Sequence, residues 1–189
     1  MKKQAMPIST WLGNQLDVES ATVYDFDIED IAHHLGKICR YNGGVDEHYS
    51  VAQHSCLLAD MVPAPLKRAA MLHDAAEYVL GDIITPVKMM FPEIRKLEQR
   101  ILAKIMEAFD VPWNGQIESE LKVYERVLLA TEKRDLKTRD LTDWENIKDV
   151  VPLPERIVPM DDHSAKMYFL RYFHMLQNQH RYSASPSAA

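Results

Sequence analysis

The fold class of this chain is indicated most clearly by the stretch Leu66-Lys-Arg-Ala-Ala-Met-Leu-His-Asp-Ala-Ala-Glu-Tyr-Val-Leu-Gly81. Its apolar residues recur at the spacing of a helix face rather than in strand alternation. Its four alanines are small enough to let a second helix pack closely. Gly81 suits the position just after a helix, where the left-handed conformation is common. The stretch therefore predicts one helix over residues 66–80 that packs against other helices.

Helical periodicity continues on both sides of this stretch. We expect further helices from the N-cap Asp27 to a point before Gly43, and over residues 50–61, 92–109, 116–136 and 162–179. One short strand is expected over residues 21–26, and the segment 142–159 is expected to be a proline-containing connection. The predicted fold class is all-α. Residues 1–26 form an irregular N-terminal segment, residues 27–182 one compact domain, and residues 183–189 a small, polar, disordered tail.

Length and composition are those of a single globular domain. The 189 residues are 47% hydrophobic and 26% charged, and no apolar run approaches the ~18 residues of a membrane span. Neither a signal peptide nor a disulfide framework is expected, because the N-terminus is polar and the chain has two cysteines, Cys39 and Cys56. The net charge of −6 argues against a protein that grips a nucleic acid polymer. We therefore expect a cytoplasmic protein with neither a membrane nor a nucleic acid as its partner.

Several polar residues stand where the helical period calls for apolar ones. His73 and Asp74 lie inside the alanine-rich stretch, and Glu77 follows on the same helix face. His54 belongs to the preceding predicted helix, and Glu125 lies at the edge of the inward stripe of residues 116–136. A helix-bundle core is a common place for a metal site of histidines and carboxylates. A histidine inside a helical core is also often a hydrogen-bonded structural residue, and Glu125 is equally compatible with a solvated helix edge. Spacing alone leaves both interpretations open.

A longer match favours the metal site. The stretch Met71-Leu-His-Asp-Ala-Ala-Glu-Tyr-Val-Leu-Gly-Asp-Ile-Ile-Thr-Pro-Val-Lys88 resembles the signature of the HD-domain metal-dependent phosphohydrolases. More narrowly, it is similar to small 5′-deoxynucleotidases and phage-type dATP triphosphohydrolases. The resemblance extends to His54 in Val-Ala-Gln-His, to Arg40 with its aromatic neighbour and to Leu128-Leu-Ala-Thr-Glu-Lys-Arg-Asp-Leu136. It covers about residues 27–140.

The resemblance implies roles for ten residues. The metal ligands fall on His54, His73, Asp74 and Glu125, and at the last position the family usually has aspartate. The catalytic acidic residues fall on Glu77 and Asp82. The substrate-binding residues fall on Arg40, Tyr41, Lys88 and His33. Tyr41 stands where the deoxynucleotidases have tryptophan. His33 would share a helix face with Lys37 and Arg40 and so point at the phosphate.

The implied activity is metal-dependent hydrolysis of a (deoxy)nucleotide phosphate in nucleotide-pool control. One divalent ion, Mn²⁺, Co²⁺, Fe²⁺, Ni²⁺ or Zn²⁺, suits two histidines with two carboxylates. The product is orthophosphate if the chain is a 5′-deoxynucleotidase, and inorganic triphosphate if it is a dATP triphosphohydrolase. The expected partners are a small-molecule nucleotide substrate and further copies of the chain in a homo-oligomer. The alternative is a catalytically inactive HD-like module that binds a nucleotide or acts as a scaffold.

Overall fold

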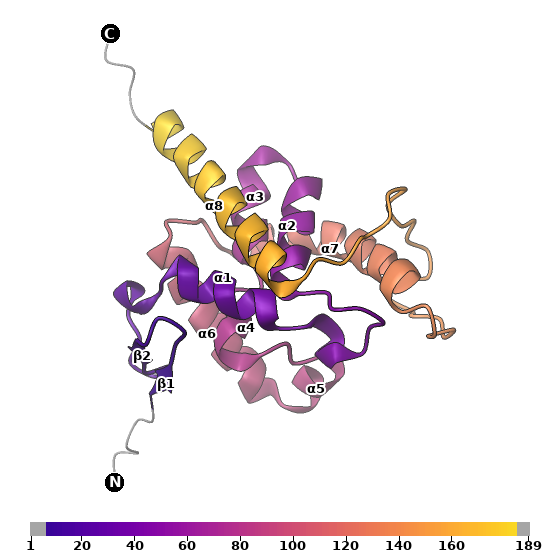
Figure 1. Ribbon diagram of the computed structural model, residues 1–189, viewed down its shortest axis with the longest axis horizontal. Coiled ribbons are helices and arrows are strands. Elements are labelled where there is room, and N and C mark those ends of the chain that lie inside the picture. Colours follow the sequence, from indigo (N-terminus) through magenta and orange to yellow (C-terminus); the bar gives the residue numbers. More distant parts are fainter. Residues whose placement is uncertain (1–6, 185–189) are drawn as a thin grey trace.

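The computed structural model describes residues 7–184, and its regular structure is almost entirely helical (Figure 1). The all-α prediction is confirmed. The longer helices are α1 (Ile28–Lys37), α2 (Val51–Met61), α6 (Pro92–Ala108), α7 (Gly115–Leu136) and α8 (Asp162–Ala184). The shorter ones are η1 (Val23–Asp25), η2 (Arg40–Gly43), η3 (Ala64–Leu66), α3 (Lys67–Leu72), α4 (Glu77–Leu80) and α5 (Thr85–Met90).

The N-terminal segment contains a small hairpin. Strand β1 (Ile8–Ser9) pairs antiparallel with β2 (Gln15–Leu16). The strand predicted over residues 21–26 is wrong, because this part of the chain forms the short helix η1. Thr22 and Asp25 form a capping box there, in which each side chain accepts a hydrogen bond from the other end of the turn. These local bonds satisfy the backbone donors of the turn. In a strand, the same donors would need acceptors on a neighbouring strand.

Helix α8 holds the core together. It lies across α1, α2 and α3 and contacts all three (Figure 1). Its inner face carries Ala165 and Phe169, both fully buried, and continues with the buried aromatic residues Tyr172 and Phe173. Helix α2 is enclosed on most sides, with eight of its eleven residues buried. The polar side chain of His54 is therefore carried into the interior by the most deeply buried helix.

The single helix predicted over residues 66–80 is interrupted. Helix α3 ends at Leu72, four residues of turn follow, and α4 begins at Glu77. Within the turns, the Ala75 amide donates to the Leu72 carbonyl and the Glu77 amide donates to the Asp74 carbonyl, both over three residues. Side chains three residues apart eclipse one another in such tight turns. The break therefore brings Asp74 and Glu77 to the same side of the chain.

Most other predicted helix ends agree with the structure. Asp27 caps α1, Ser50 caps α2 and Asn114 caps α7, each through a side-chain oxygen that accepts a backbone amide hydrogen. Helix α5 was not predicted, and α8 runs past the expected end at 179 to Ala184. The predicted disordered tail is therefore helical at its first two residues, and residues 185–189 lie outside the described part. Among the described helices, none has both the length and the apolar character that crossing a bilayer requires.

The connection between α7 and α8 has no long helix, as predicted, but it is fixed to the body of the protein. The Gln53 amide side chain donates to the Val158 carbonyl and accepts from the Met160 amide, at 2.8 and 2.9 Å. Earlier in the connection, the Leu153 amide donates to the Thr131 hydroxyl at 2.9 Å. These bonds hold the connection against α2 and α7.

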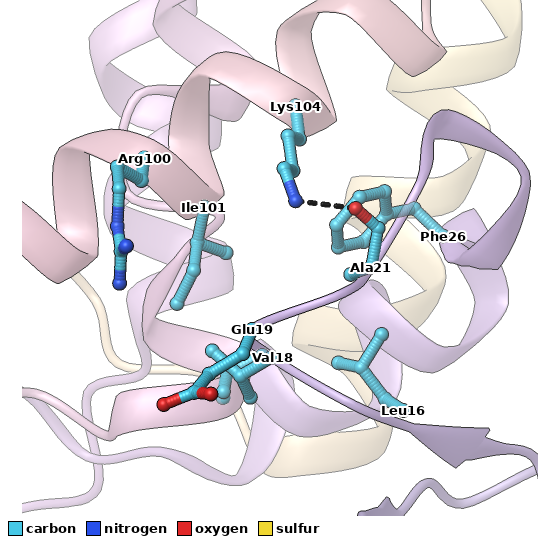
Figure 2. A pocket seen from close by; sticks show the side chains of 9 residues that line it. Leu16, Val18, Glu19, Ala21, Phe26, Arg100, Ile101 and Lys104 are labelled. Atoms are coloured by element: carbon cyan, nitrogen blue, oxygen red, sulfur yellow. Dashed lines mark hydrogen bonds between the residues drawn. The ribbon is translucent and has the colours of Figure 1, made fainter. Parts of the chain in front are cut away.

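A small cavity lies between the N-terminal segment and α6 (Figure 2). Its volume is about 40 Å³ and its lining is largely apolar, with Leu16, Phe26 and Ile101 among its side chains. Lys104 on α6 donates a hydrogen bond to the Ala21 carbonyl beside it (Figure 2). Ligand pockets usually measure about 300–1,000 Å³. This cavity is therefore a packing gap that joins the N-terminal segment to α6.

Candidate metal centre

A cleft of about 790 Å³ opens between α2, the turn after α3, α5 and α7. This volume is that of a site for a small organic ligand. Nine of the ten site residues expected from the resemblance line the cleft, and His33 is the exception. The charged side chains of the lining are the bases Arg40, Lys88, Lys122, Arg126 and Lys137 and the acids Asp74, Glu77, Asp82 and Glu125. The bases suit an anionic ligand, and the acids suit a cation.

Three side chains converge on one point of the cleft. His54 comes from α2, and His73 and Asp74 come from the turn after α3. One ligand atom from each of these residues lies within 4.8 Å of the others. The Asp74 carboxylate oxygen Oδ2 is 3.1 Å from Nε2 of His73 and 3.6 Å from Nε2 of His54. Two imidazole nitrogens and a carboxylate oxygen at this spacing are a suitable donor set for a divalent ion.

The other nitrogen of each imidazole ring is already engaged. Nδ1 of His73 lies 2.7 Å from the Ala70 carbonyl oxygen, and Nδ1 of His54 lies 2.6 Å from Oε1 of Glu132. Carbonyl and carboxylate oxygens only accept, so both Nδ1 atoms carry hydrogen and donate. Such partners orient metal-binding histidines and fix their tautomer. Both Nε2 atoms are thereby directed at Asp74.

The charges around His54, His73 and Asp74 favour the binding of a positively charged group. Burial alone would lower the pKa of His73, but the adjacent Asp74 carboxylate outweighs burial and raises this pKa to about 9. Burial would raise the pKa of Asp74, yet His73, His54 and Arg40 hold it far below its usual range. For His54, burial and then Arg40 lower the pKa, which favours the neutral ring. A proton on His73 therefore provides the positive charge beside the Asp74 carboxylate. A metal ion bound at this site would provide that positive charge instead.

Two further acids adjoin the group. Glu125 on α7 is about one-third exposed, and its Oε1 lies 4.0 Å from Nε2 of His73. It stands outside the closely spaced set of His54, His73 and Asp74. Glu77 is almost fully buried, and its Oε2 has no hydrogen-bond partner. Burial, followed by Asp74 and Asp82, raises the pKa of Glu77 well above its usual range.

Glu132 on α7 is a site residue to which the sequence reasoning assigned no role. Its carboxylate is fully buried and accepts hydrogen bonds from His54, Tyr41, Tyr49 and Arg40. The Tyr49 hydroxyl is 2.8 Å away and the Arg40 guanidinium 3.4 Å away. The sequence does contain an indication that Glu132 faces inward, because it lies four residues from both Leu128 and Leu136 on the inward stripe. The same kind of misplaced charge had pointed to His73 and Asp74.

Tyr41 reaches Glu132 from an unusual backbone conformation. Tyr41 and Asn42 have φ values of 57° and 52°, in the left-handed region that non-glycine residues seldom adopt. Such conformations cost of order 1–3 kcal/mol and collect at functional sites. The hydroxyl bond to Glu132 helps to hold the turn, and it places the ring on the wall of the cleft.

The predicted phosphate-binding cations are both paired within the protein. Arg40 donates to Asp74 at 3.3 Å and to Glu132 at 3.4 Å, while its buried Nε has no partner. Lys88 on α5 forms ion pairs with Glu98 on α6 and with Glu77, the latter at 3.5 Å. Burial would lower the pKa of Lys88, but the bond to Glu98 and the charge of Glu77 raise it. Lys88 therefore stays charged at the wall of the cleft.

The structure does not bring His33 into this group. Its ring stacks on Trp11, with centroids 4.3 Å apart, and burial followed by Lys166 lowers its pKa. Lys37 shares a face of α1 with His33, as predicted, but Arg40 does not, because α1 ends at Lys37 and the chain turns before Arg40.

Comparison with known proteins agrees with this geometry. Residues 19–142 match the family model described as 5′-deoxynucleotidase YfbR-like. The chain belongs to the YfbR-like 5′-deoxynucleotidase family. Among its relatives is the uncharacterized protein YfdR of Escherichia coli, with 32% identity over 89% of this chain and 94% of the relative. An uncharacterized protein of Rhodobacter capsulatus, RCAP_rcc00048, is 41% identical over 53% of this chain and 56% of its own length.

Membership of this HD-domain family carries a general conclusion about activity. The family supports a nucleotide phosphohydrolase of HD type, with a divalent metal and a small-molecule nucleotide substrate. The cluster of His54, His73 and Asp74 is a site of the required kind. In this chain, His73 and Asp74 of the cluster lie in the turn between α3 and α4.

Proposed function

We propose that this protein releases orthophosphate from a deoxynucleoside 5′-monophosphate. The observation that carries the proposal is the convergence of His54, His73 and Asp74 beside the buried Glu77 in a cleft lined by cations. A degenerate binding module would have no need to keep both histidine tautomers fixed toward Asp74. The intact arrangement therefore favours the enzyme over an inactive module.

The metal would be held by His54, His73 and Asp74, with Glu125 near enough to complete the set by a small side-chain movement. The two neutral imidazoles and the carboxylate fit Mn²⁺, Co²⁺, Fe²⁺, Ni²⁺ or Zn²⁺. When bound, such an ion neutralises phosphate charge and lowers the pKa of water.

The remaining residues divide the work on the phosphate ester. Glu77, which lines the cleft and whose Oε2 has no hydrogen-bond partner, takes the proton of the attacking water and returns it to the leaving 5′ oxygen. The water oxygen bonds to phosphorus as the ester P–O bond breaks, which yields orthophosphate and a nucleoside. Arg40 and Lys88 hold the phosphate oxygens. Asp82 binds a sugar hydroxyl.

The choice of a monophosphate rests on the family match and not on the cations. A triphosphate needs more cationic contacts than a monophosphate. Lys37 and Lys133 lie outside the cleft, since Lys37 pairs with Asp162 at 2.5 Å on the surface and Lys133 donates to the Thr142 carbonyl. Further bases line the cleft, however: Lys122, Arg126 and Lys137. We prefer the monophosphate because the matching family is described as 5′-deoxynucleotidase, and hydrolysis of dATP to deoxyadenosine and triphosphate is the alternative.

Product analysis tests the proposal. Metal-stripped protein is given Mn²⁺, Co²⁺ or Zn²⁺ singly and a panel of ribo- and deoxynucleoside mono-, di- and triphosphates, with His73→Ala as control. We expect orthophosphate from deoxynucleoside monophosphates and none from the variant. Triphosphate release would establish the triphosphohydrolase instead, and nucleotide binding without turnover would establish the inactive module. The expected homo-oligomer stays a prediction, which light scattering on the purified protein tests.

A further inference from the structure

The cleft has an aromatic end that the proposed chemistry does not use. Tyr41 and Trp144 both line the cleft, with their ring centroids 6.1 Å apart. Trp144 lies on the connection between α7 and α8, just beyond residues 19–142 that match the family. Asn146 lines the cleft beside it. The half-buried indole of Trp144 lies on the cleft wall but has no role in the proposed phosphate chemistry. A second role for this side chain is therefore sought in the rest of the substrate.

The Trp144 ring is held in a fixed position. Its Nε1 donates to Oδ2 of Asp140 at 3.0 Å, and its carbonyl accepts from the Ile147 amide at 2.9 Å. The Lys133 ammonium lies 5.7 Å from the ring centroid. Lys133 lines a neighbouring cavity of about 340 Å³ and not the cleft, whereas Trp144 lines both. The ring is therefore preorganised to face a ligand in the cleft.

The aromatic end is joined to the metal-binding end through a short series of contacts. The Tyr41 hydroxyl binds one oxygen of Glu132, and the other oxygen of Glu132 binds His54. A ligand whose phosphate lies at His54, His73 and Asp74 thus extends past Tyr41 toward Trp144. In a nucleoside 5′-phosphate, the group at the far end from the phosphate is the base.

We propose that Trp144 is the stacking platform for the base of the nucleotide and that the Asn146 amide hydrogen-bonds the edge of that base. The inference rests on the proposed function and adds a base-binding subsite to it. Every nucleobase has a π face that stacks on an aromatic side chain, and an amide both donates and accepts hydrogen bonds. Trp144 therefore makes the enzyme prefer nucleotides over sugar phosphates that lack a base.

The test compares two substrates that differ in the base alone. Deoxyadenosine 5′-monophosphate and 2-deoxyribose 5-phosphate are given to the metal-loaded wild type and to Trp144→Ala, Trp144→Phe and Trp11→Ala. Trp144→Ala should raise KM for the nucleotide about 5- to 150-fold, the range for loss of one stacked base. Its kcat for the nucleotide and its kinetics on the sugar phosphate should stay near wild type. Trp144→Phe should restore most of the loss, and Trp11→Ala, whose exposed ring lies outside the cleft, should behave as wild type.

Equal effects of Trp144→Ala on both substrates, or none on either, would overturn the inference while leaving the phosphohydrolase intact. If the wild type cleaves neither compound, the proposed function fails, and titration calorimetry then decides the inference separately. In that case the metal-loaded wild type must bind the nucleotide more tightly than the sugar phosphate, and Trp144→Ala must abolish the difference. Equal affinities in the wild type would refute the subsite. Circular dichroism and thermal unfolding of each variant show whether the fold is kept.

Discussion

Replacing Glu132 with glutamine should both destabilise the fold and weaken metal binding. In the wild type the two carboxylate oxygens accept from four donors, two on each oxygen. Glutamine keeps one accepting oxygen, and its amino group cannot accept. Whichever way the amide turns, two buried donors lose their acceptor, either Arg40 with Tyr41 or His54 with Tyr49.

The size of the loss follows from these bonds. All four bonds end on a charged carboxylate, and a hydrogen bond to a charged group contributes about 1.5–3 kcal/mol. The loss of two such bonds gives about 3–6 kcal/mol, similar to the cost of removing one partner from a buried ion pair. For a chain of this size, that loss lowers the melting temperature by about 6–24 °C. The measurement is urea or thermal unfolding of metal-free protein.

The metal effect of Glu132→Gln has a separate cause. The amide oxygen should stay with Arg40, because a guanidinium only donates, and the amino group then faces Nδ1 of His54, which can accept. This contact favours the tautomer with hydrogen on Nε2, which then cannot bind a metal. Loss of such an orienting partner typically weakens metal affinity about 10- to 100-fold, which Mn²⁺ titration calorimetry measures. Glu120→Gln, on the exposed face of the same helix, should change neither quantity. Tyr49→Phe removes one bond to the carboxylate, so it should cost about 1.5–3 kcal/mol with little change in metal affinity. Stability within about 1 kcal/mol of wild type, or unchanged metal affinity in Glu132→Gln, would refute the reasoning.

Three further results are expected. Gly36→Ala should destabilise the protein by about 1–3 kcal/mol in thermal unfolding, because the added Cβ would lie 2.9 Å from the Asp162 carbonyl oxygen. Gly115→Ala, with open space around it, should be neutral or slightly stabilising. Equal effects of the two substitutions would contradict the packing of α1 on α8. Saturating Mn²⁺ at about 100 times its Kd should stabilise the wild type by about 2.7 kcal/mol and leave His54→Ala unchanged, and a shift in both would place the ion elsewhere. Hydrogen bonds from Arg134 lower the pKa of Asp135 in the folded protein, so its contribution to stability is complete above the unfolded value of about 4 and declines as the pH falls below it. The stability difference between the wild type and Asp135→Asn should therefore shrink between about pH 6 and about pH 3, and a constant difference would speak against the pKa shift.

The sequence predicted most helices and nine of the twenty residues that line the candidate site. Helix caps such as Asp27 and Ser50 act over two or three residues, so their signals are readable without the fold. The polar residues at apolar positions pointed to His54, His73 and Asp74, which the structure brings together. The break after α3 was not predicted, because its alanine-rich residues have high helix propensity and tertiary packing overrides that preference.

The differences between the expected and the observed site have a common origin. The resemblance assigned His33 to the substrate, and the expected helix face would have joined it to Arg40, but α1 ends before Arg40. A substrate-binding role for His33 stays a prediction. Glu132 was passed over because its significance lies in partners far away in the chain, with Arg40 at a separation of 92 residues. Periodicity reports which face of a helix turns inward, and it does not report what that face meets.

The sequence by itself determined that this chain is helical and that polar groups with metal-binding chemistry enter its core. Local periodicity and capping suffice for the first, and the rarity of unpaired buried charges suffices for the second. The tertiary structure alone decided that Glu132 joins His54 to Tyr41 and that Trp144 stands at the far end of the cleft. These relations depend on how helices and connections distant in sequence pack together, because a buried carboxylate takes whatever donors that packing brings within hydrogen-bond distance.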